Sequence, residues 1–530
     1  MVAAGKEDRV NGTGDEHPGG EALVQATLRE ILMAPVYEVA RQTELCAMGK
    51  LSARLGCQVW LKREDQQPVH SFKLRGAFNK IHSLTPAQRA AGVVAASAGN
   101  HAQGVALAAT RSGIRSVIVM PTTTPEIKVQ SVRRHGGEVV LFGNAFDDAY
   151  GEAMRLAERE GLTLVPPFDD AAVIAGQGTV GMELLQQRRE LDAVFVPVGG
   201  GGLIAGIGAY LKALAPEIRV IGVEPEDAAC LKAALQAGRP VDLSRVGLFA
   251  DGVAVKRIGR APFELARHCV DEVITVSSDE ICAAVQDIYE DTRAIAEPAG
   301  ALSLAGLKRY CQREDQRESL SGQTQLAAIL SGANINFHTL RYVSERCELG
   351  EGKEAVLAVT IPERQGAFLQ FCRLLGQRSI TEFNYRLSGR DRANVFVGIR
   401  LKQHDELTGI CNALAEAGYP HQDLSEDETA KLHVRYMVGG LPPEPLSERL
   451  YQLVFPECPG ALERFLTDLG DRWNISLFHY RNHGAANGRV LLGLEVEEAE
   501  LSDLDTRLAS LNMDCRDVTD SAAYRFFLRG

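Results

Sequence analysis

The sequence predicts an α/β protein in which a large domain of parallel β-sheets with flanking helices precedes two copies of a small α+β module. Three observations support this prediction. Short apolar runs alternate with helix-length segments between Lys73 and Val285, the character of the sequence changes near Arg346, and the chain then repeats itself. Alternating strands and helices are typical of parallel sheets covered by helices on both faces. At 530 residues the chain is also too long for one ordinary core.

The elements of the large domain follow in order along the chain. Residues 1–20 are polar and rich in glycine, which predicts a disordered tail, and an amphipathic helix is expected from Glu21 to just before Pro35. The apolar runs predict strands at 58–62, 92–96, 116–120, 138–142, 193–198, 219–223 and 326–330, with helices at 101–112 and 146–160. A charged stretch at 312–325 predicts a surface loop. Ligands bind at the carboxyl ends of such strands, so the turns that follow them are the places to expect chemistry.

The C-terminal third contains the internal repeat. Residues 361–368 (IPERQGAF) match residues 455–462 (FPECPGAL), and residues 384–386 (NYR) match residues 479–481 (HYR). Each copy has the order strand, helix, strand, strand, helix, strand, which is the order of a ferredoxin-like sandwich. The expected divisions of the chain are a tail at 1–20, a large domain at 21–345, and modules at 346–440 and 441–530, with a linker at 439–443.

Composition limits the possible partners. The formal net charge is -12 and both signs are interspersed, which leaves no basic surface for nucleic acid or an anionic membrane. No run of about 18 apolar residues predicts a membrane span. The eleven cysteines are scattered without a CxxC motif, as in proteins of a reducing cytoplasm, and the N-terminus lacks the apolar core of a signal peptide. We therefore expect a small-molecule partner.

The heptad 70–76 (HSFKLRG) places Lys73 among small, apolar and aromatic neighbours, where an extended segment gives way to a helix. A lysine that loses hydration has a lowered pKa, and its free amine can attack a carbonyl. Schiff-base chemistry at Lys73 is therefore one hypothesis. In isolation, an SxK tripeptide more often marks an ordinary lysine on a surface helix, so the other motifs must decide.

Four consecutive glycines, Gly199 to Gly202, follow the predicted strand at 193–198 and precede Leu203 and a helix. Backbone N–H groups without side chains around them, together with the helix dipole, favour bound phosphate. A tight strand-to-helix turn is the structural alternative. The same stretch also fits G-x-G-x-x-A, with Glu224 ending the next strand, so a dinucleotide site in an oxidoreductase stays open. That alternative gives Lys73 no role.

Two further turns follow predicted strands. The first, residues 97–101 (SAGNH), offers Ser97, Asn100 and backbone donors at a helix N-terminus, which suit a carboxylate and a ring hydroxyl. Ordinary N-capping would also explain this turn. The second, residues 331–334 (SGAN), offers the Ser331 hydroxyl, which can hydrogen-bond a heteroaromatic nitrogen or simply cap a turn.

Together these motifs resemble one family. Residues 71–77, 97–101, 199–203 and 331–334 have the order found in fold type II pyridoxal-phosphate enzymes, whose catalytic domain is tryptophan synthase β-like. From about Glu21 to the C-terminus the chain is similar to the biosynthetic threonine deaminases (threonine ammonia-lyases), whose tail is a tandem pair of ACT-like regulatory modules. The resemblance implies an α/β catalytic domain followed by two α+β modules.

The resemblance also implies roles. Lys73 holds the aldehyde of pyridoxal 5'-phosphate covalently and, once released, acts as general base. The implied cofactor contacts are Phe72 beside the ring, Asn100 at the ring hydroxyl, Ser331 at the pyridine nitrogen, and Gly199, Gly200, Gly201, Gly202 and Leu203 at the phosphate. The implied contacts of the substrate carboxylate are Ser97, Gly99, Asn100 and His101.

The implied reaction converts L-threonine to 2-oxobutanoate and ammonia, with L-serine as a poorer substrate that gives pyruvate. A neutral Ser331 beside the ring nitrogen favours loss of a β-hydroxyl over a long-lived carbanion. Ala98 stands where related serine racemases have a second, acid/base serine, which disfavours racemisation. Cys230 stands where some relatives bind a cation through a carboxylate, so no metal is expected.

The resemblance further implies the first committed step of isoleucine synthesis, inhibition by isoleucine, activation by valine, and a cytoplasmic homotetramer. The turns 363–366 and 457–460 are the candidates for effector contacts. A non-catalytic amino-acid sensor built on a degenerate lyase domain is the remaining alternative. The intact Lys73 and glycine loop argue against it.

Overall fold

The computed structural model describes residues 19–317, 320–376, 378–387, 391–402, 406–427, 430–431, 434, 447–456, 461–470, 472–481, 487–511 and 513–521. The chain divides into two compact units, Met1–Cys347 and Glu348–Gly530. Most of the expected tail (residues 1–18) and the expected linker at 439–443 lie outside the described residues.

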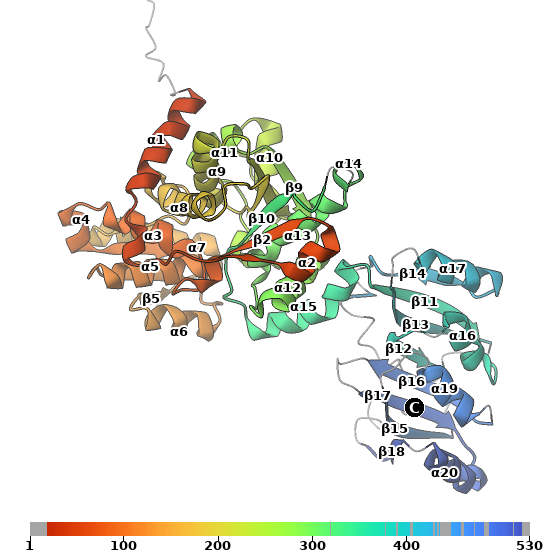
Figure 1. Ribbon diagram of the computed structural model, residues 1–530. Coiled ribbons are helices and arrows are strands. Elements are labelled where there is room, and N and C mark those ends of the chain that lie inside the picture. Colours follow the sequence, from red (N-terminus) through yellow and green to blue (C-terminus); the bar gives the residue numbers. More distant parts are fainter. Residues whose placement is uncertain are drawn as a thin grey trace, which may run out of the picture. The chain divides into compact units, whose positions relative to one another are not determined.

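The strands described for the N-terminal unit form two sheets (Figure 1). The six-stranded sheet has the order β1 (Leu45–Ala47), β2 (Gln58–Arg63), β10 (Gln325–Leu330), β7 (Ala193–Pro197), β8 (Arg219–Pro225) and β9 (Glu272–Val276). Its strands are parallel except for β1. The four-stranded sheet is parallel and has the order β5 (Glu138–Leu141), β4 (Ser116–Met120), β3 (Val93–Ala96) and β6 (Thr163–Leu164). The predicted strands are confirmed, but their division into two sheets was not visible in the sequence.

Helices cover both sheets. They are α1 (Gly20–Met33), α2 (Gly49–Leu55), α3 (Lys73–His82), α4 (Pro86–Ala91), α5 (Asn100–Arg111), α6 (Glu126–Arg134), α7 (Phe146–Glu160), α8 (Ala171–Gln187), α9 (Gly202–Leu214), α10 (Cys230–Ala237), α11 (Arg260–Cys269), α12 (Ser278–Thr292), α13 (Pro298–Gln312), α14 (Glu314–Arg317) and α15 (Phe337–Gly350), with 3-10 turns η1 (Val36–Glu38), η2 (Glu64–Gln66) and η3 (Asp251–Val253). The short helix α14 lies in the stretch predicted as a loop. No helix in the described ranges is both long and apolar enough to span a membrane.

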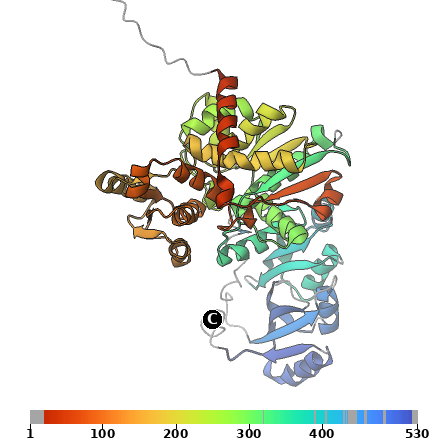
Figure 2. The ribbon, with the colours of Figure 1, turned by 60° about the vertical axis from the view of Figure 1, so that its left-hand side comes forward.

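Small residues bring the helices α8 and α9 into close contact. A Cβ atom on Gly206 of α9 would lie 2.4 Å from the backbone oxygen of Ile174, and one on Gly178 of α8 would lie 2.4 Å from Cδ1 of Ile31. Ile31 belongs to α1, which lies against α8 and α9 (Figures 1 and 2). Any larger side chain at these glycines would separate the helices, so this packing fixes the helix α9 that follows the glycine loop.

The C-terminal unit contains the repeat as two successive modules. The first has β11 (Glu354–Pro362), α16 (Ala367–Leu375), β12 (Ile380–Arg386), β13 (Arg392–Arg400), α17 (Glu406–Glu416) and β14 (His421–Asp423). The second has β15 (Glu448–Pro456), α19 (Ala461–Leu469), β16 (Asn474–Arg481), β17 (Asn487–Glu495), η5 (Glu498–Glu500), α20 (Leu501–Ser510) and β18 (Asp514–Asp517). This confirms the predicted order of elements in each copy.

Both modules contribute to one antiparallel sheet, in the order β14-β11-β13-β12-β16-β17-β15-β18 among the described strands. The modules join where β12 pairs with β16, from Glu382 opposite Arg481 to Arg386 opposite Leu477. Helices α16, α17, α19 and α20 cover one face of the sheet (Figure 1) and share a single apolar core with it. The two copies therefore fold as one body.

Candidate functional site

Lys73 begins α3, and backbone pairing holds the segment that leads to it. The carbonyl of His70 accepts a hydrogen bond from the Ala333 N–H (2.9 Å), and the Phe72 N–H donates to the Ser331 carbonyl (3.2 Å). His70 has a φ of 54°, in the left-handed region that few non-glycine residues adopt. The predicted turn after β10 thus holds the residues just before Lys73 in place.

The side chain of Lys73 is partly buried. Its Nζ donates to the Pro167 carbonyl (3.3 Å) and lies 5.1 Å from the centre of the Phe72 ring. Loss of hydration lowers the pKa of Lys73 to about 8, while the nearby Glu297 carboxylate opposes this shift. At pH 7 a pKa of 8 leaves about a tenth of the amine unprotonated, far more than for an ordinary lysine. Lys73 is therefore set up as a nucleophile and base.

The glycine loop, Gly199–Leu203, lies between β7 and α9. A Cβ atom on Gly200 would lie 2.1 Å from Cδ1 of Phe168, and Gly201 has a φ of 90°. Glycine is therefore required at both positions. The helix begins at Gly202, and the first N–H groups of a helix have no partner within it, so they carry the positive end of the helix dipole. The loop can hold a phosphate.

The turn 97–101 contains the start of α5 at Asn100. The Gly99 N–H donates to the Ser97 hydroxyl (3.3 Å). The first N–H groups of α5, beginning with that of Asn100, have no acceptor within the helix and can bind a carboxylate. Ala98 contributes only a methyl group, which can neither give nor take a proton.

His101 has a fixed and neutral side chain. Its Nε2–H donates to the Val165 carbonyl (2.8 Å), and its side chain is buried. Burial, and next the charge of Lys73, lower the pKa of His101 to about 3. The imidazole is already committed to a backbone carbonyl, so the backbone N–H is the group that His101 offers to a ligand.

Glu297, which directly precedes α13, lies in the same region. Its Oε1 accepts from Asn100 Nδ2 (2.5 Å), and Asn100 Oδ1 accepts from Asn334 Nδ2 (2.7 Å). Burial, and next the charge of Asp251, raise the pKa of Glu297 to about 7. Sequence reasoning missed Glu297 altogether, and it identified Asn334 only as the end of the turn 331–334.

Ser331 is buried, and its hydroxyl donates to the Ala299 carbonyl (3.2 Å). Ser71 pairs with Gly332 through the backbone, and its buried hydroxyl has no hydrogen-bond partner in the described part of the chain. A buried, unpaired hydroxyl costs free energy unless a ligand or water meets it. Both hydroxyls therefore lie beside the Lys73 segment with hydrogen-bonding capacity to spare.

The segment 165–168 connects the parts of the site. Val165 accepts from His101, Pro167 accepts from Lys73, and Phe168 packs against Gly200. This segment follows the two-residue strand β6, which sequence reasoning did not identify. The predicted residues from four distant parts of the chain thus meet in one region.

Glu224, the possible ribose ligand of a dinucleotide site, instead forms hydrogen bonds to the backbone of the protein. Its carboxylate is fully buried and accepts from the N–H groups of Leu231 (2.7 Å) and Lys232 (2.9 Å). Cys230 donates through its thiol to the Gly199 carbonyl (3.2 Å). Glu224 is thus buried and bonded within the fold, so the dinucleotide alternative lacks an acidic residue available to a ribose.

The site fits pyridoxal phosphate by the chemistry of its donors. The cofactor needs an amine for its aldehyde, a cradle for a dianion and a hydrogen-bonding group for its pyridine nitrogen. Lys73, the loop at Gly200 and Ser331 supply these groups. The unpaired Ser71 hydroxyl is further capacity for a polar ligand.

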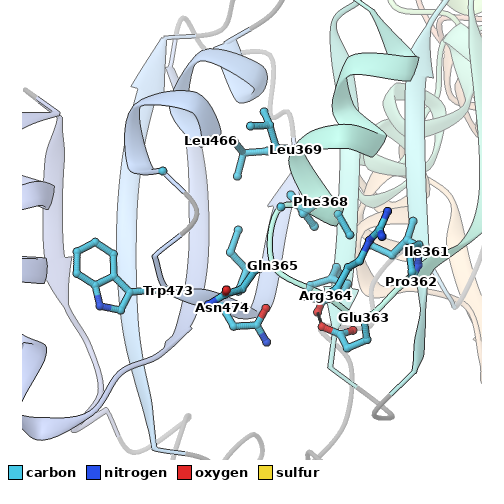
Figure 3. Close-up of a pocket in the computed structure, with 15 residues that line it drawn as sticks. Ile361, Pro362, Glu363, Arg364, Gln365, Phe368, Leu369, Leu466, Trp473 and Asn474 are labelled. Carbon is cyan, nitrogen blue, oxygen red and sulfur yellow. Dashed lines mark hydrogen bonds between the residues drawn. The ribbon is translucent and has the colours of Figure 1, made fainter.

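The C-terminal unit holds a pocket between its two modules (Figure 3). Glu363 accepts at Oε1 from the Tyr385 hydroxyl (2.7 Å), whereas its buried Oε2 has no hydrogen-bond partner among the described residues. Burial raises the pKa of Glu363. Leu369 of α16 and Leu466 of α19 lie close together at the other end of the pocket (Figure 3). The second predicted turn, 457–460, lies outside the described residues.

Two family models match the chain. Residues 36–332 match the model described as pyridoxal-phosphate dependent enzyme, and residues 345–434 and 442–528 match the C-terminal regulatory domain of threonine dehydratase. The chain is 59% identical to L-threonine dehydratase biosynthetic IlvA of Escherichia coli (strain K12), over 95% of this chain and 97% of that protein. It is 49% identical to the mitochondrial threonine dehydratase of Saccharomyces cerevisiae, over 95% of this chain and 89% of that one.

Two solved structures resemble part of the chain in fold and sequence. The processed form of threonine deaminase isoform 2 from Solanum lycopersicum matches with a TM-score of 0.59 and 47% identity, over 61% of this chain and 92% of that chain. Maize serine racemase matches with a TM-score of 0.56 and 33% identity, over 60% and 96% of the two chains. The match of residues 345–434 and 442–528 to the regulatory domain of threonine dehydratase places the chain with the dehydratases. The chain belongs to the pyridoxal-phosphate-dependent biosynthetic threonine dehydratases.

Proposed function

We propose that this chain catalyses the dehydration and deamination of L-threonine to 2-oxobutanoate and ammonia, and more slowly converts L-serine to pyruvate. The observation that carries the proposal is the lysine of lowered pKa at the start of α3, in one region with a hydroxyl-bearing turn and a glycine loop that can hold a phosphate. Relatives that share about half of their residues with the chain are named threonine dehydratases.

Each residue of the site then has a task. Pyridoxal phosphate, when bound, supplies the electron-withdrawing system that acidifies the substrate Cα–H. Lys73 would hold the cofactor through its aldehyde, and its free amine would take the substrate Cα proton at Nζ. The backbone N–H groups at the start of α5 hold the carboxylate in one orientation. Phe72, whose ring centre lies 5.1 Å from Lys73 Nζ, would pack beside the cofactor ring.

Two neutral groups restrict the outcome. Ser331 offers a hydroxyl and no carboxylate to the ring nitrogen, so the nitrogen gains no charge partner there and departure of the β-hydroxyl is favoured. Ala98, which stands where related serine racemases have an acid/base serine, carries no group that can reprotonate the Cα. Both features favour elimination over racemisation.

The C-terminal unit is proposed to bind isoleucine, which inhibits, and valine, which activates. The pocket at Glu363 suits a branched amino acid. The Glu363 carboxylate can accept a hydrogen bond from the effector's ammonium, and Phe368, Leu369 and Leu466 can pack against the effector's side chain. Effector binding acts only through a difference in affinity between two states of the enzyme.

We further propose a homotetramer located in the cytoplasm. Among the described strands, β14 and β18 lie at the two ends of the sheet of the C-terminal unit, and a strand edge can associate with another subunit. The cysteines in the described part of the chain are free thiols, as a reducing compartment requires. Light scattering coupled to size-exclusion chromatography measures the subunit number directly.

One assay tests the proposed function. Purified protein with bound cofactor should release ammonia and 2-oxobutanoate in equal amounts from L-threonine, and release pyruvate more slowly from L-serine. Isoleucine should reduce the rate and valine should restore it. Absence of ammonia release from either amino acid, together with isoleucine binding, would instead support a non-catalytic sensor.

A further inference from the structure

We propose that Glu297 and Asn334 are positioning residues that fix the side-chain amide of Asn100, so that one of its N–H groups faces the ring oxygen of the cofactor. This inference rests on the proposed place of Asn100 beside that oxygen. Asn334 acts through Asn100, whereas Glu297 acts through Asn100 and also lies near the amine of Lys73.

A chain of hydrogen bonds dictates how the Asn100 amide is turned. The Val69 carbonyl can only accept, so the Asn334 atom 2.8 Å away must be its donor nitrogen, Nδ2. The same nitrogen lies 2.7 Å from Asn100, so the Asn100 atom that it meets must be the acceptor, Oδ1. A backbone carbonyl thus sets the orientation of Asn334, and Asn334 sets that of Asn100.

Glu297 fixes the other end of the amide. With Oδ1 turned to Asn334, Nδ2 of Asn100 faces Glu297 and donates to its Oε1 at 2.5 Å. Glu297 Oε1 can accept from Asn100 Nδ2 in either protonation state of the carboxyl group, because a bound proton can reside on Oε2, so Glu297 favours the same orientation of the amide as Asn334 does. The two contacts reinforce each other.

Space around this chain of contacts is restricted. A Cβ atom on Gly332 would lie 2.3 Å from Glu297 Oε1 and 3.1 Å from Asn100 Nδ2. One on Gly252 would lie 2.9 Å from the Cβ of Ala299. Glu297 itself is buried, with 4% of its surface exposed. The glycine in the turn after Ser331 therefore makes room for Glu297 to reach Asn100.

This arrangement leaves the second side-chain N–H of Asn100 available to the cofactor. An amide nitrogen has two hydrogens, and the described residues accept only the one given to Glu297. The remaining N–H is held in a fixed direction because the amide plane is fixed at both ends. An oxygen on the cofactor ring can accept it without reorganisation of the protein, which is the condition for strong electrostatic binding.

The test measures cofactor affinity in the full-length apoenzyme, by following the absorbance and fluorescence changes on addition of pyridoxal phosphate. Three variants are informative: Asn334→Asp reverses the polarity at Asn100, Glu297→Leu removes the acceptor, and Glu297→Gln keeps one. Asn79→Asp is the matched control, because buried Asn79 also donates its amide to a backbone carbonyl, that of Ala172 (2.7 Å), away from the proposed contacts.

We expect Asn334→Asp and Glu297→Leu to raise the cofactor dissociation constant about 10-fold and to change the visible absorbance of the bound cofactor. Glu297→Gln and Asn79→Asp should stay within about 3-fold of the wild type. The inference is wrong if Asn334→Asp and Asn79→Asp behave alike, or if Glu297→Leu binds as well as Glu297→Gln.

A double-mutant cycle separates this inference from the proposed function. If Asn334 acts through Asn100, adding Asn334→Asp to Asn100→Ala should cause no further loss of cofactor affinity. Additive losses would contradict the inference and leave the site intact. If Asn100→Ala alone leaves both affinity and absorbance unchanged, the proposed contact between Asn100 and the ring is wrong, and the inference fails with it. Should Asn334→Asp not fold, Asn334→Leu, which removes the donor to Asn100 Oδ1, provides the same cycle.

Discussion

Arg75 Nη1 and Glu183 Oε1 lie 2.6 Å apart, and neither side chain is exposed to solvent. Arg75 belongs to α3, the helix that Lys73 begins, and Glu183 belongs to α8. Glu64 binds the other side of Arg75 (2.8 Å), and Lys62 binds Glu183 (2.6 Å). Two cations and two anions thus form a balanced buried network, which ties α3 to the neighbouring sheet and helix.

Removing one member of this network should destabilise the protein strongly. Arg75→Met leaves two buried carboxylates short of a cation, which typically costs about 3–5 kcal/mol. Arg115→Met is the control, because Arg115 pairs with Glu138 and Glu160 while 45% exposed, and surface pairs contribute about 0–1 kcal/mol. Thermal unfolding of the apoenzymes should show a large drop in midpoint for Arg75→Met only. Equal drops would contradict this account of the network.

The glycine loop predicts a second result. Gly200→Ala places a methyl group 2.1 Å from the Phe168 ring, so the loop must move and cofactor affinity should fall by about 10-fold or more. Gly151→Ala is the control. A Cβ atom there meets nothing within 4 Å, and alanine favours the helix α7. Equilibrium titration with pyridoxal phosphate compares the two. Unchanged affinity in Gly200→Ala would argue against phosphate at this loop.

Much of this site could be predicted from sequence because its residues follow strands. A parallel sheet brings the carboxyl ends of its strands to one edge, which explains why the turns after 193–198 and 326–330 converge. The turn after 92–96 belongs to the other sheet and meets them through the contact between Asn100 and Asn334. The three strands β3, β7 and β10 are observed at 93–96, 193–197 and 325–330. These strands are buried, so their residues are apolar, and continuous apolar runs are recognisable from residue type alone.

Glu297 and the segment 165–168 could not be predicted in the same way. Glu297 precedes a helix with Pro298 at its first position, a pattern that normally signals only a helix start. Pro167 contributes a backbone carbonyl, which leaves no trace in residue type. The division into two sheets is also a matter of strand pairing, and strands of similar composition do not show which partner each one takes.

The lowered pKa of Lys73 predicts how cofactor uptake depends on pH. As pH rises through about 8, Lys73 loses its proton and the nucleophilic amine accumulates, so the rate of covalent uptake by the apoenzyme should rise about 10-fold between pH 7 and pH 9 and then level off. Stopped-flow absorbance measures this rate. The control is the reaction of the cofactor with Nα-acetyl-lysine in water, whose free side-chain amine has an ordinary pKa. The rate of this reaction should keep rising beyond pH 9. A similar continued rise in the protein would contradict the lowered pKa.

A substitution in the pocket at Glu363 should change inhibition by isoleucine and leave the uninhibited rate of catalysis nearly unchanged. Glu363→Gln removes the negative charge offered to an effector's ammonium, so the isoleucine concentration for half inhibition should rise about 10-fold while the uninhibited rate stays within about 2-fold. Glu416→Gln, on the exposed surface of α17, should change neither value. Unaltered inhibition in Glu363→Gln would place the effector elsewhere.

The central claim is that Lys73 binds the cofactor and moves the proton during threonine turnover. Its most direct test compares wild type, Lys73→Ala and Lys80→Ala for the visible absorbance of bound cofactor and for 2-oxobutanoate release from L-threonine. Lys80 lies on the same helix and pairs with Asp170 at 2.6 Å. We expect Lys73→Ala to lose the absorbance band and about 1000-fold in turnover, and Lys80→Ala to keep both. Full turnover by Lys73→Ala would contradict the claim.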